Sequence, residues 1–310
     1  MKKNKKLLII LLAVVFLLTG CTKTLKVDKE IIKNPETGQS LTKNILCKPT
    51  DKNLTEIYEK YSKEVGYDKL PECENFKINS GKDEGLWTNV FVKTLAWVII
   101  KVGKIVKNYG LALIITSLII RLIAFPITKK TAMQSELMKK AQPELDKINK
   151  KYEDKTDQES LIKKSQEISM VYKKYNIAPL SGCLFAFLQL PLFIGFLEAI
   201  NRVPVIFEDT FLTLYLGQTP YNAVMHGSIQ YAIIVVILAF TTYFSFKLNS
   251  TGQQNEQTAM MNKTMVIMIV VMSLFMTTAL DIYWLTSNLF TIGQNLLIKR
   301  SKKLNEKVWV

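Results

Sequence analysis

The chain has a single histidine, His226, and this scarcity excludes a histidine metal cluster and a Ser-His-Asp catalytic triad. The sequence also lacks a Gly-rich phosphate loop of the Walker type. Its basic residues, which give a net charge of +15, carry neither interleaved aromatic residues nor a nucleic-acid motif. We therefore expect no enzyme, no bound cofactor or metal and no sequence-specific nucleic-acid binding.

Long apolar runs are what the sequence does contain. Hydrophobic residues make up 48% of the chain and are gathered into runs instead of being spread with helical or strand periodicity. We expect an all-α polytopic membrane protein with five transmembrane helices, an interfacial amphipathic helix and a cytoplasmic helical hairpin.

The first 20 residues have the basic, apolar and small-residue regions of a signal peptide. The segment Leu18-Thr19-Gly20-Cys21 resembles the bacterial lipobox, in which the cysteine is acylated, for example with palmitate, and becomes the mature N-terminus. Cys21 would then lie on the outer face of the membrane. The alternative is an unmodified cysteine in a signal anchor, but the apolar region is shorter than the ~17 residues of a span.

Residues 21–85 are expected to form a lipidated extracytoplasmic segment, too small and polar for a confident prediction of a core. Cys47 and Cys73 lie in it and could form a disulfide in an oxidising environment. Residues 86–108 are predicted to form an interfacial amphipathic helix whose lysines lie within ~120° of one another; these are Lys93, Lys101, Lys104 and Lys107. A sixth span with snorkelling lysines is the alternative.

Five apolar runs within a core of residues 109–300 are predicted to span the bilayer, the last two joined by a tight turn at Asp281; the runs are Tyr109–Thr128, Leu180–Ile200, Ser228–Phe246, Thr264–Leu280 and Ile282–Ile298. Residues 129–176 carry about a dozen lysines, and the tail at 301–310 is also basic. Because short basic loops remain in the cytoplasm, we expect a bacterial cell membrane protein with its N-terminus outside and its C-terminus in the cytoplasm.

A cytoplasmic hairpin is predicted at residues 129–178, because apolar residues recur there every three or four positions in two segments; these residues are Met133, Leu137, Ala141, Leu145, Ile148 and Tyr152, then Leu161, Ser165, Ile168, Tyr172 and Tyr175. Residues 153–157 form a polar break, and Thr156 with Glu159 has the spacing of a capping box that would open the second helix.

Arg121 is the only charged residue in the first span. An ionisable side chain at that depth costs about 2.5–3.5 kcal/mol on insertion scales, so its presence indicates a function. Snorkelling toward Lys129 is the alternative, but helical side chains lean toward the N-terminus, which here is away from the nearer interface.

Three sequence motifs resemble the YidC/Oxa family of membrane protein insertases, and the layout of a lipobox followed by five spans resembles the Gram-positive lipoprotein branch of that family. The motifs are Ile120-Arg121-Leu122 followed by Pro126-Ile127-Thr128, then Pro179-Leu180-Ser181-Gly182-Cys183-Leu184 with Gln189-Leu190-Pro191-Leu192-Phe193, and Tyr283-Trp284-x-x-Ser287-Asn288-Leu289 with Gln294. Ala178 and Phe185 depart from the family pattern, which usually has Asn and often Pro there.

The resemblance implies a hydrophilic groove within the membrane in which a nascent membrane protein docks, without nucleotide hydrolysis. Arg121 would be its charged floor, and the matching groove residues are Ser117, Gln189, Tyr283, Trp284 and Asn288. For Gln189 and Asn288 the alternative is interhelical hydrogen bonding, and for Tyr283 and Trp284 it is interfacial anchoring.

The implied partners are nascent membrane proteins and the lipid bilayer, with the Sec translocon and the ribosome as further candidates. Two other functions remain open. One is a small-solute or anion transporter that uses Arg121 as an anion site, and the other is a structural membrane assembly lipoprotein without transfer activity.

Overall fold

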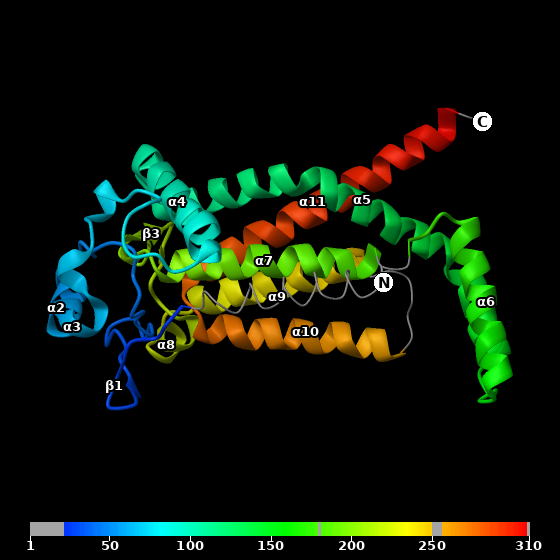
Figure 1. Ribbon diagram of the computed structural model, residues 1–310, viewed down its shortest axis with the longest axis horizontal. Coiled ribbons are helices and arrows are strands. Elements are labelled where there is room, and N and C mark those ends of the chain that lie inside the picture. The colour runs from blue at the N-terminus through cyan, green and yellow to red at the C-terminus, as the bar shows by residue number, and fades with distance from the viewer. Residues whose placement is uncertain (1–21, 179–180, 250–255, 309–310) are drawn as a thin grey trace. The chain divides into compact units, whose positions relative to one another are not determined.

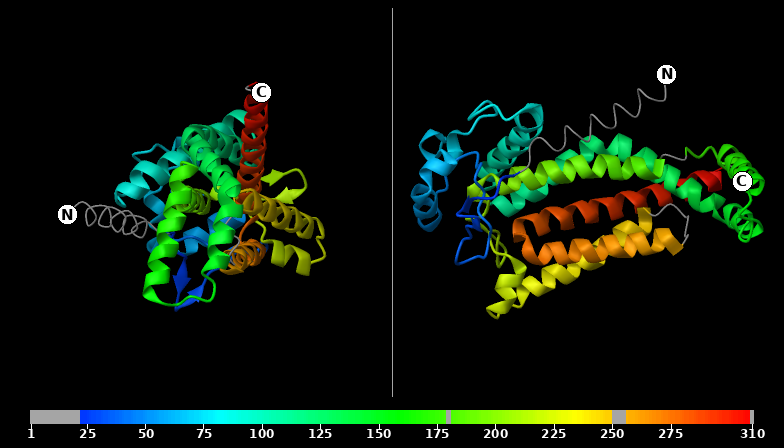
Figure 2. Two further views of the ribbon diagram at one scale, coloured as in Figure 1. Left: turned by 90° about the vertical axis from the view of Figure 1, so that its right-hand side faces the viewer. Right: turned by 60° about the horizontal axis from the view of Figure 1, so that its bottom comes forward.

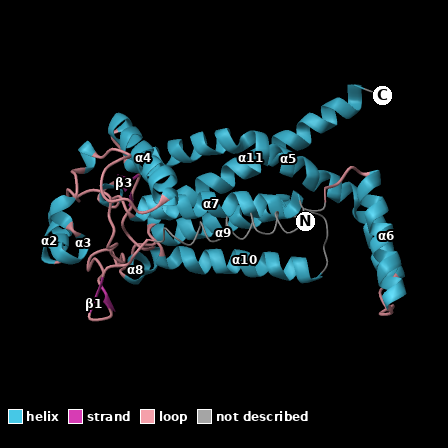
Figure 3. Ribbon diagram, viewed as in Figure 1, coloured by secondary structure: helices cyan, strands magenta, loops and turns pink. Residues whose placement is uncertain are grey.

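A computed structural model describes residues 22–178, 181–249 and 256–308 (Figure 1). The longer helices are α2 (Lys52–Lys60), α4 (Lys93–Val106), α5 (Tyr109–Lys151), α6 (Gln158–Lys174), α7 (Ser181–Asn201), α9 (Gln230–Asn249), α10 (Glu256–Phe275) and α11 (Thr278–Val308). Figure 3 shows that helix dominates the described chain. The signal peptide and Cys21 lie outside the described residues.

The remaining elements are short. Two small antiparallel hairpins pair β1 (Lys26–Val27) with β2 (Glu30–Ile31) and β3 (Thr210–Phe211) with β4 (Leu214–Tyr215). The short helices are α3 (Ser62–Val65), α8 (Pro220–Met225), a π-helix at Trp87–Val92, and 3-10 helices at Tyr67–Lys69, Cys73–Asn75 and Pro204–Ile206.

The chain divides into two compact units. Unit 1 consists of Met1–Ile119, Leu190–Leu238 and Val270–Thr286, and unit 2 of Ile120–Gln189, Ala239–Ile269 and Ser287–Val310. Helices α5, α7, α9, α10 and α11 each contribute residues to both units.

Two of the described helices are long and apolar enough to cross a bilayer, at Tyr109–Lys151 and Gln230–Leu248, and a shorter apolar helix runs over Lys263–Phe275. The expected helical character of the protein is confirmed, whereas the count of five spans stays a prediction.

Residues 22–86 form a folded lobe, called here the N-terminal lobe. This lobe has a hydrophobic core, which its size and polar composition did not predict. Six buried side chains pack together in it: Leu25, Leu41, Ile45, Leu54, Tyr58 and Tyr67. Asp51 caps α2 by accepting a hydrogen bond from the backbone N–H of Leu54 at 2.9 Å. A disulfide joins Cys47 to Cys73 and cross-links a lobe whose core is small. The core is built from a few residues that lie far apart in the lobe sequence, so no periodic pattern of apolar residues predicted it.

Helix α4 places its predicted lysines in different environments. Lys101 and Lys104 are exposed, but Lys93 is only 3% exposed and its ammonium group donates to the carbonyl oxygen of Lys82 at 2.9 Å. Burial lowers the pKa of the Lys93 ammonium group. Lys93 departs from the predicted polar face because it follows the π-helix and is covered by residues of the N-terminal lobe.

Helices α5 and α6 form the hairpin of unit 2, and the left view of Figure 2 shows α6 beside the last part of α5. The carboxylate of Glu144 on α5 accepts hydrogen bonds from Lys174 and Tyr175, which follow one another at the end of α6. The carboxylate of Glu167 on α6 accepts hydrogen bonds from Lys151 and Tyr152 at the end of α5. The two helices therefore run antiparallel. The buried core of the hairpin consists of Met138, Ala141, Leu145, Val171 and Ile177.

Two details of the hairpin differ from the sequence prediction. The N-cap of α6 is Asp157, whose carboxylate accepts from the N–H of Ser160 at 2.8 Å, so the capping box that starts at Thr156 was wrong by one residue. Leu161 was placed on the packed face but is 53% exposed, because the contact face of α6 passes through Val171 instead.

The turn before α11 lies earlier than predicted. α10 ends at Phe275 and α11 begins at Thr278, so Asp281 belongs to the first turn of α11 and does not separate two spans. The N–H groups of Thr278 and Ala279 donate to the carbonyl oxygens of Gln218 and Leu216 at 2.9 and 3.0 Å. A loop distant in sequence therefore satisfies the helix N-terminus, which the local sequence could not reveal.

Candidate functional site

Arg121 on α5 is buried, with 5% of its surface exposed, and it contacts two other helices within unit 2. Its Nη2 atom donates to Gln189 Oε1 on α7 at 2.8 Å and to Ser287 Oγ on α11. Both acceptors are neutral, so these two bonds orient the guanidinium group without cancelling its formal charge. The next residue, Leu122, is 61% exposed, which shows that Arg121 occupies the protein-facing side of α5.

Polar contacts between α5 and α11 continue beyond Arg121. Thr128 donates to Gln294 Oε1 at 3.0 Å, and both side chains are buried. Ser287 and Gln294 belong to the motif of the last span, yet nothing in the sequence identified them as partners of α5. Their position after the Tyr-Trp pair, at helical spacing, was the available signal.

Ser117 lies one helical turn before Arg121 and is 1% exposed. Its hydroxyl group donates to the carbonyl oxygen of Leu113 at 2.6 Å, within its own helix. The proton of this hydroxyl is therefore committed to the backbone, and the oxygen remains as an acceptor.

Asn288 makes an interhelical contact. Its Nδ2 atom donates to Thr242 Oγ1 on α9 at 2.8 Å, and both side chains are buried in unit 2. This hydrogen bond is the alternative interpretation given above, in which Asn288 connects spans, and such bonds contribute about 0.6–1.7 kcal/mol in membrane proteins.

Tyr283 and Trp284 stack on α7 within unit 1. The ring of Tyr283 lies 4.3 Å from that of Phe196, and the ring of Trp284 lies 4.8 Å from that of Phe193, measured between centroids. Tyr283 is 2% exposed. The two aromatic residues thus pack α11 against α7, with each ring pair stacked at an interplanar angle of 20° or 19°.

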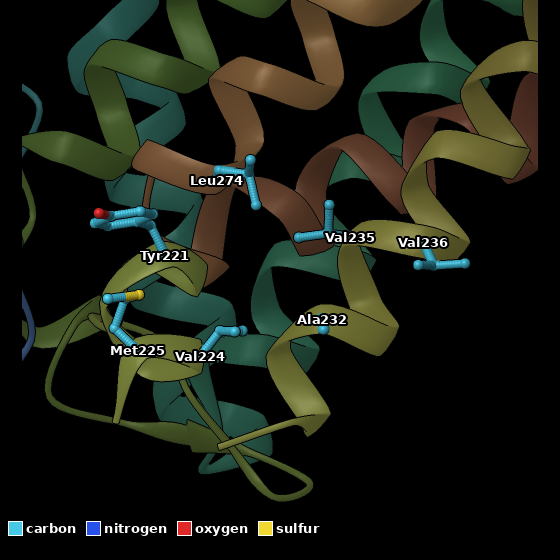
Figure 4. Close-up of a pocket in the computed structure, with 7 residues that line it drawn as sticks. All are labelled: Tyr221, Val224, Met225, Ala232, Val235, Val236 and Leu274. Atoms are coloured by element: carbon cyan, nitrogen blue, oxygen red, sulfur yellow. The ribbon is translucent and has the colours of Figure 1, made fainter. Parts of the chain in front are cut away.

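A separate cavity of about 320 Å³ lies in unit 1, between α8, the start of α9 and the end of α10 (Figure 4). Its lining is apolar except for the hydroxyl group of one tyrosine, and consists of Tyr221, Val224, Met225, Ala232, Val235, Val236 and Leu274. A cavity of this chemistry accepts hydrocarbon, and it is not the hydrophilic groove that the sequence predicted.

The polar site around Arg121 combines one guanidinium group with neutral amide and hydroxyl groups. Among the residues that the structure describes, no group of three His, Cys, Asp or Glu side chains could hold a metal ion. A buried guanidinium group oriented by amide and hydroxyl oxygens attracts acidic groups in a region of low dielectric constant.

The chain matches the model of a family described as "60Kd inner membrane protein" over residues 101–306. It is 38% identical over 221 residues to a protein of Bacillus anthracis named "Membrane protein insertase YidC 2", which covers 70% of this chain and 83% of that protein. It is 37% identical over 216 residues to "Membrane protein insertase MisCA" of Bacillus subtilis, covering 69% of this chain and 79% of that one.

The solved structures that resemble this chain include one titled "Active YidC insertase crystal structure with the first transmembrane domain resolved". It has 24% sequence identity and a TM-score of 0.49, and the match covers 78% of this chain and 51% of that longer chain.

Proposed function

The chain belongs to the YidC/Oxa family of membrane protein insertases, and from this premise we propose that it moves nascent membrane proteins into the bilayer through a hydrophilic groove with Arg121 at its centre. The observation that carries the proposal is the buried guanidinium group of Arg121, held by Gln189 and Ser287 from two other helices. A charge placed at such a cost in a membrane helix is expected to serve a function.

The mechanism follows from two opposing free energies. A short acidic segment of the substrate enters the membrane more easily when a positive charge and water lower its transfer cost. Burial of the following apolar span in lipid, at about 25 cal/mol per Å², then supplies a driving force on the order of tens of kcal/mol. Nucleotide hydrolysis is not needed in this account.

The same proposal includes a topology. It has five spans, with α4 in the outer interface, an acylated Cys21 outside the cell and the C-terminus in the cytoplasm. This topology would place the disulfide of the N-terminal lobe in an oxidising environment. The hairpin of α5 and α6 would then receive the arriving chain, and the basic tail could meet ribosomal RNA through charge alone. Cooperation with the Sec translocon is a further part of the proposal.

The test is complementation of a strain depleted of its own insertase, with insertion of a single-span substrate that has a short acidic tail as the readout. Arg121→Ala and Arg121→Glu should reduce insertion by about tenfold or more, because losing roughly 1.4 kcal/mol of attraction changes an equilibrium tenfold. Arg121→Lys should retain most of the activity because it keeps the charge. Leu122→Ala, on the exposed side of the same helix, is the matched control.

If Arg121→Ala and Arg121→Glu both inserted the substrate as well as the wild-type protein does, the positive charge of Arg121 would not contribute to insertion. An anion transporter would instead show anion flux through the purified protein that depends on Arg121, and a purely structural assembly factor would show no contact with nascent chains.

A further inference from the structure

Unit 1 has its own group of charged side chains, where the N-terminal lobe meets the end of α7. It contains two acidic and two basic side chains: Glu84, Lys93, Glu198 and Arg202. Arg202 is 0% exposed, Glu198 is 2% exposed, and Lys93 is 3% exposed. Glu84 is partly exposed, with 32% of its side-chain surface accessible. The three buried charges are costly unless each finds a partner of opposite sign.

Arg202 holds the N-terminal lobe through three contacts. Its Nη2 atom lies 2.6 Å from Glu84 Oε1, its Nε atom donates to the carbonyl oxygen of Asn44 at 2.7 Å, and its own carbonyl oxygen accepts from the N–H of Leu46 at 2.8 Å. Arg202, the residue that follows α7, therefore binds the lobe both in its middle, at Asn44 and Leu46, and near its end, at Glu84.

Glu198 lies in the last turn of α7, four residues before Arg202, whose backbone N–H donates to the carbonyl oxygen of Glu198 at 3.1 Å. Its Oε1 atom accepts from Trp87 Nε1 at 3.0 Å. Glu198 Oε2 and Arg202 Nη1 are both buried, and neither has a hydrogen-bond partner within the described part of the chain. An unsatisfied acceptor and an unsatisfied donor thus stand four residues apart, at the spacing at which glutamate and arginine side chains meet on a helix.

We propose that these four residues form a two-position latch between the N-terminal lobe and α7. Arg202 pairs with Glu84 when the lobe is seated, and it turns to Glu198 when the lobe is released. Glu198 can bind the Arg202 guanidinium group because the unsatisfied Oε2 atom of Glu198 is an acceptor and the unsatisfied Nη1 atom of Arg202 is a donor. Release of the lobe therefore does not leave an unpaired charge in the protein interior. Glu84 then returns to water with the lobe.

Lys93 fits the same arrangement. Its ammonium group is bound to the carbonyl oxygen of Lys82, two residues before Glu84, so it holds the same end of the lobe from α4. Because α7 also bears Gln189, Phe193 and Phe196, seating or releasing the lobe changes the constraint on a helix that contributes to the candidate site.

Hydrogen exchange of the full-length protein in lipid nanodiscs, followed at the Leu46 amide, distinguishes a latch from a static network. Glu84→Gln removes the partner of the seated position and should speed exchange at Leu46 by about tenfold or more. Glu198→Gln keeps an acceptor for Trp87 but removes the partner of the released position, so it should slow exchange. A two-state equilibrium thus predicts opposite directions for the two variants.

Faster exchange at Leu46 in both variants would overturn the latch, since a static network loosens whichever carboxylate is removed. An unchanged rate in Glu198→Gln or in Glu84→Gln would overturn it as well, and Glu84→Asp provides a milder second variant if Glu84→Gln fails to fold. Glu208→Gln is the control: Glu208 accepts from Thr50 at 2.8 Å, so this variant should affect Thr50 and leave Leu46 unchanged. This readout does not use insertion, so its outcome is independent of the proposed function.

Discussion

At the scale of single residues, the chemistry of the site depends on what surrounds Arg121. Gln189 and Ser287 present neutral oxygen atoms to the guanidinium group, and hydrogen bonds of this kind fix its direction while its positive field persists. The motif resemblance had already named Arg121 and Gln189, but it did not show that they touch. Ser287 belongs to the motif of the last span but was not predicted as a site residue, because helical spacing places a serine on a face without identifying its partner.

The variant Gln189→Glu tests whether insertion depends on the positive charge of Arg121 or only on the presence of its side chain. A carboxylate within hydrogen-bond distance would neutralise the guanidinium group, since opposite charges at ~4 Å attract by about 4 kcal/mol at an effective dielectric constant of 20. Insertion of a substrate with an acidic tail should fall by about tenfold although Arg121 is still present. Leu190→Ala, which alters an exposed neighbour, should insert normally.

The outcome that contradicts this expectation is a Gln189→Glu protein that is equally or more heat-stable and fully active. Such a result would mean that Arg121 serves only to hold α5 and α7 together.

At the scale of elements, the hairpin of α5 and α6 is held by two groups of side chains at its surface. Hydrogen bonds from Lys174 and Tyr175 hold the pKa of the Glu144 carboxyl below its ordinary value of 4.5. Hydrogen bonds from Lys151 and Tyr152 do the same for the pKa of the Glu167 carboxyl. A carboxyl whose pKa is lowered by folding stabilises the folded form above its ordinary pKa, and this contribution is lost as the pH falls through the lowered value.

The hairpin should therefore loosen as the pH falls below about 4.5, and not between pH 7 and 5. Spin labels at the exposed positions 146 and 166 would report this as a broader distance distribution by pulsed electron resonance. The double variant Glu144→Gln/Glu167→Gln should be broad already at pH 7 and insensitive to acid. An unchanged wild-type distribution throughout this acidic window would show that the apolar core alone fixes the two helices.

Sequence patterns predicted helices far better than their connections. Apolar runs and three-to-four-residue periodicity anticipated the long helices and the paired α5 and α6, because these signals are local. The turn at Met276–Thr277 and the N-cap at Asp157 were misplaced, since the first depends on carbonyl groups of a distant loop and the second on a choice between adjacent residues. The buried charges at the end of α7 were not predicted either, because their partners lie in distant parts of the sequence.

At the scale of the whole molecule, the comparisons confirm the family that the motifs suggested. The N-terminal lobe lies entirely outside the residues that match the family model, which begin at residue 101. Its disulfide, its small core and its buried connection to Arg202 show that this segment is a folded part of unit 1 and not a loose extension. Within unit 1 the lobe is therefore bound to the residue that follows α7.

The central claim is that a nascent chain passes beside Arg121, and photocrosslinking during translation tests it most directly. A photoreactive amino acid at position 189, where Gln189 contacts Arg121, should form an adduct when a stalled nascent membrane protein is irradiated, and none when irradiation follows release of the chain. The same group at position 122, on the exposed side of α5, should react with lipid instead. Adducts with lipid alone at position 189, or equal nascent-chain adducts at both positions, would contradict the account.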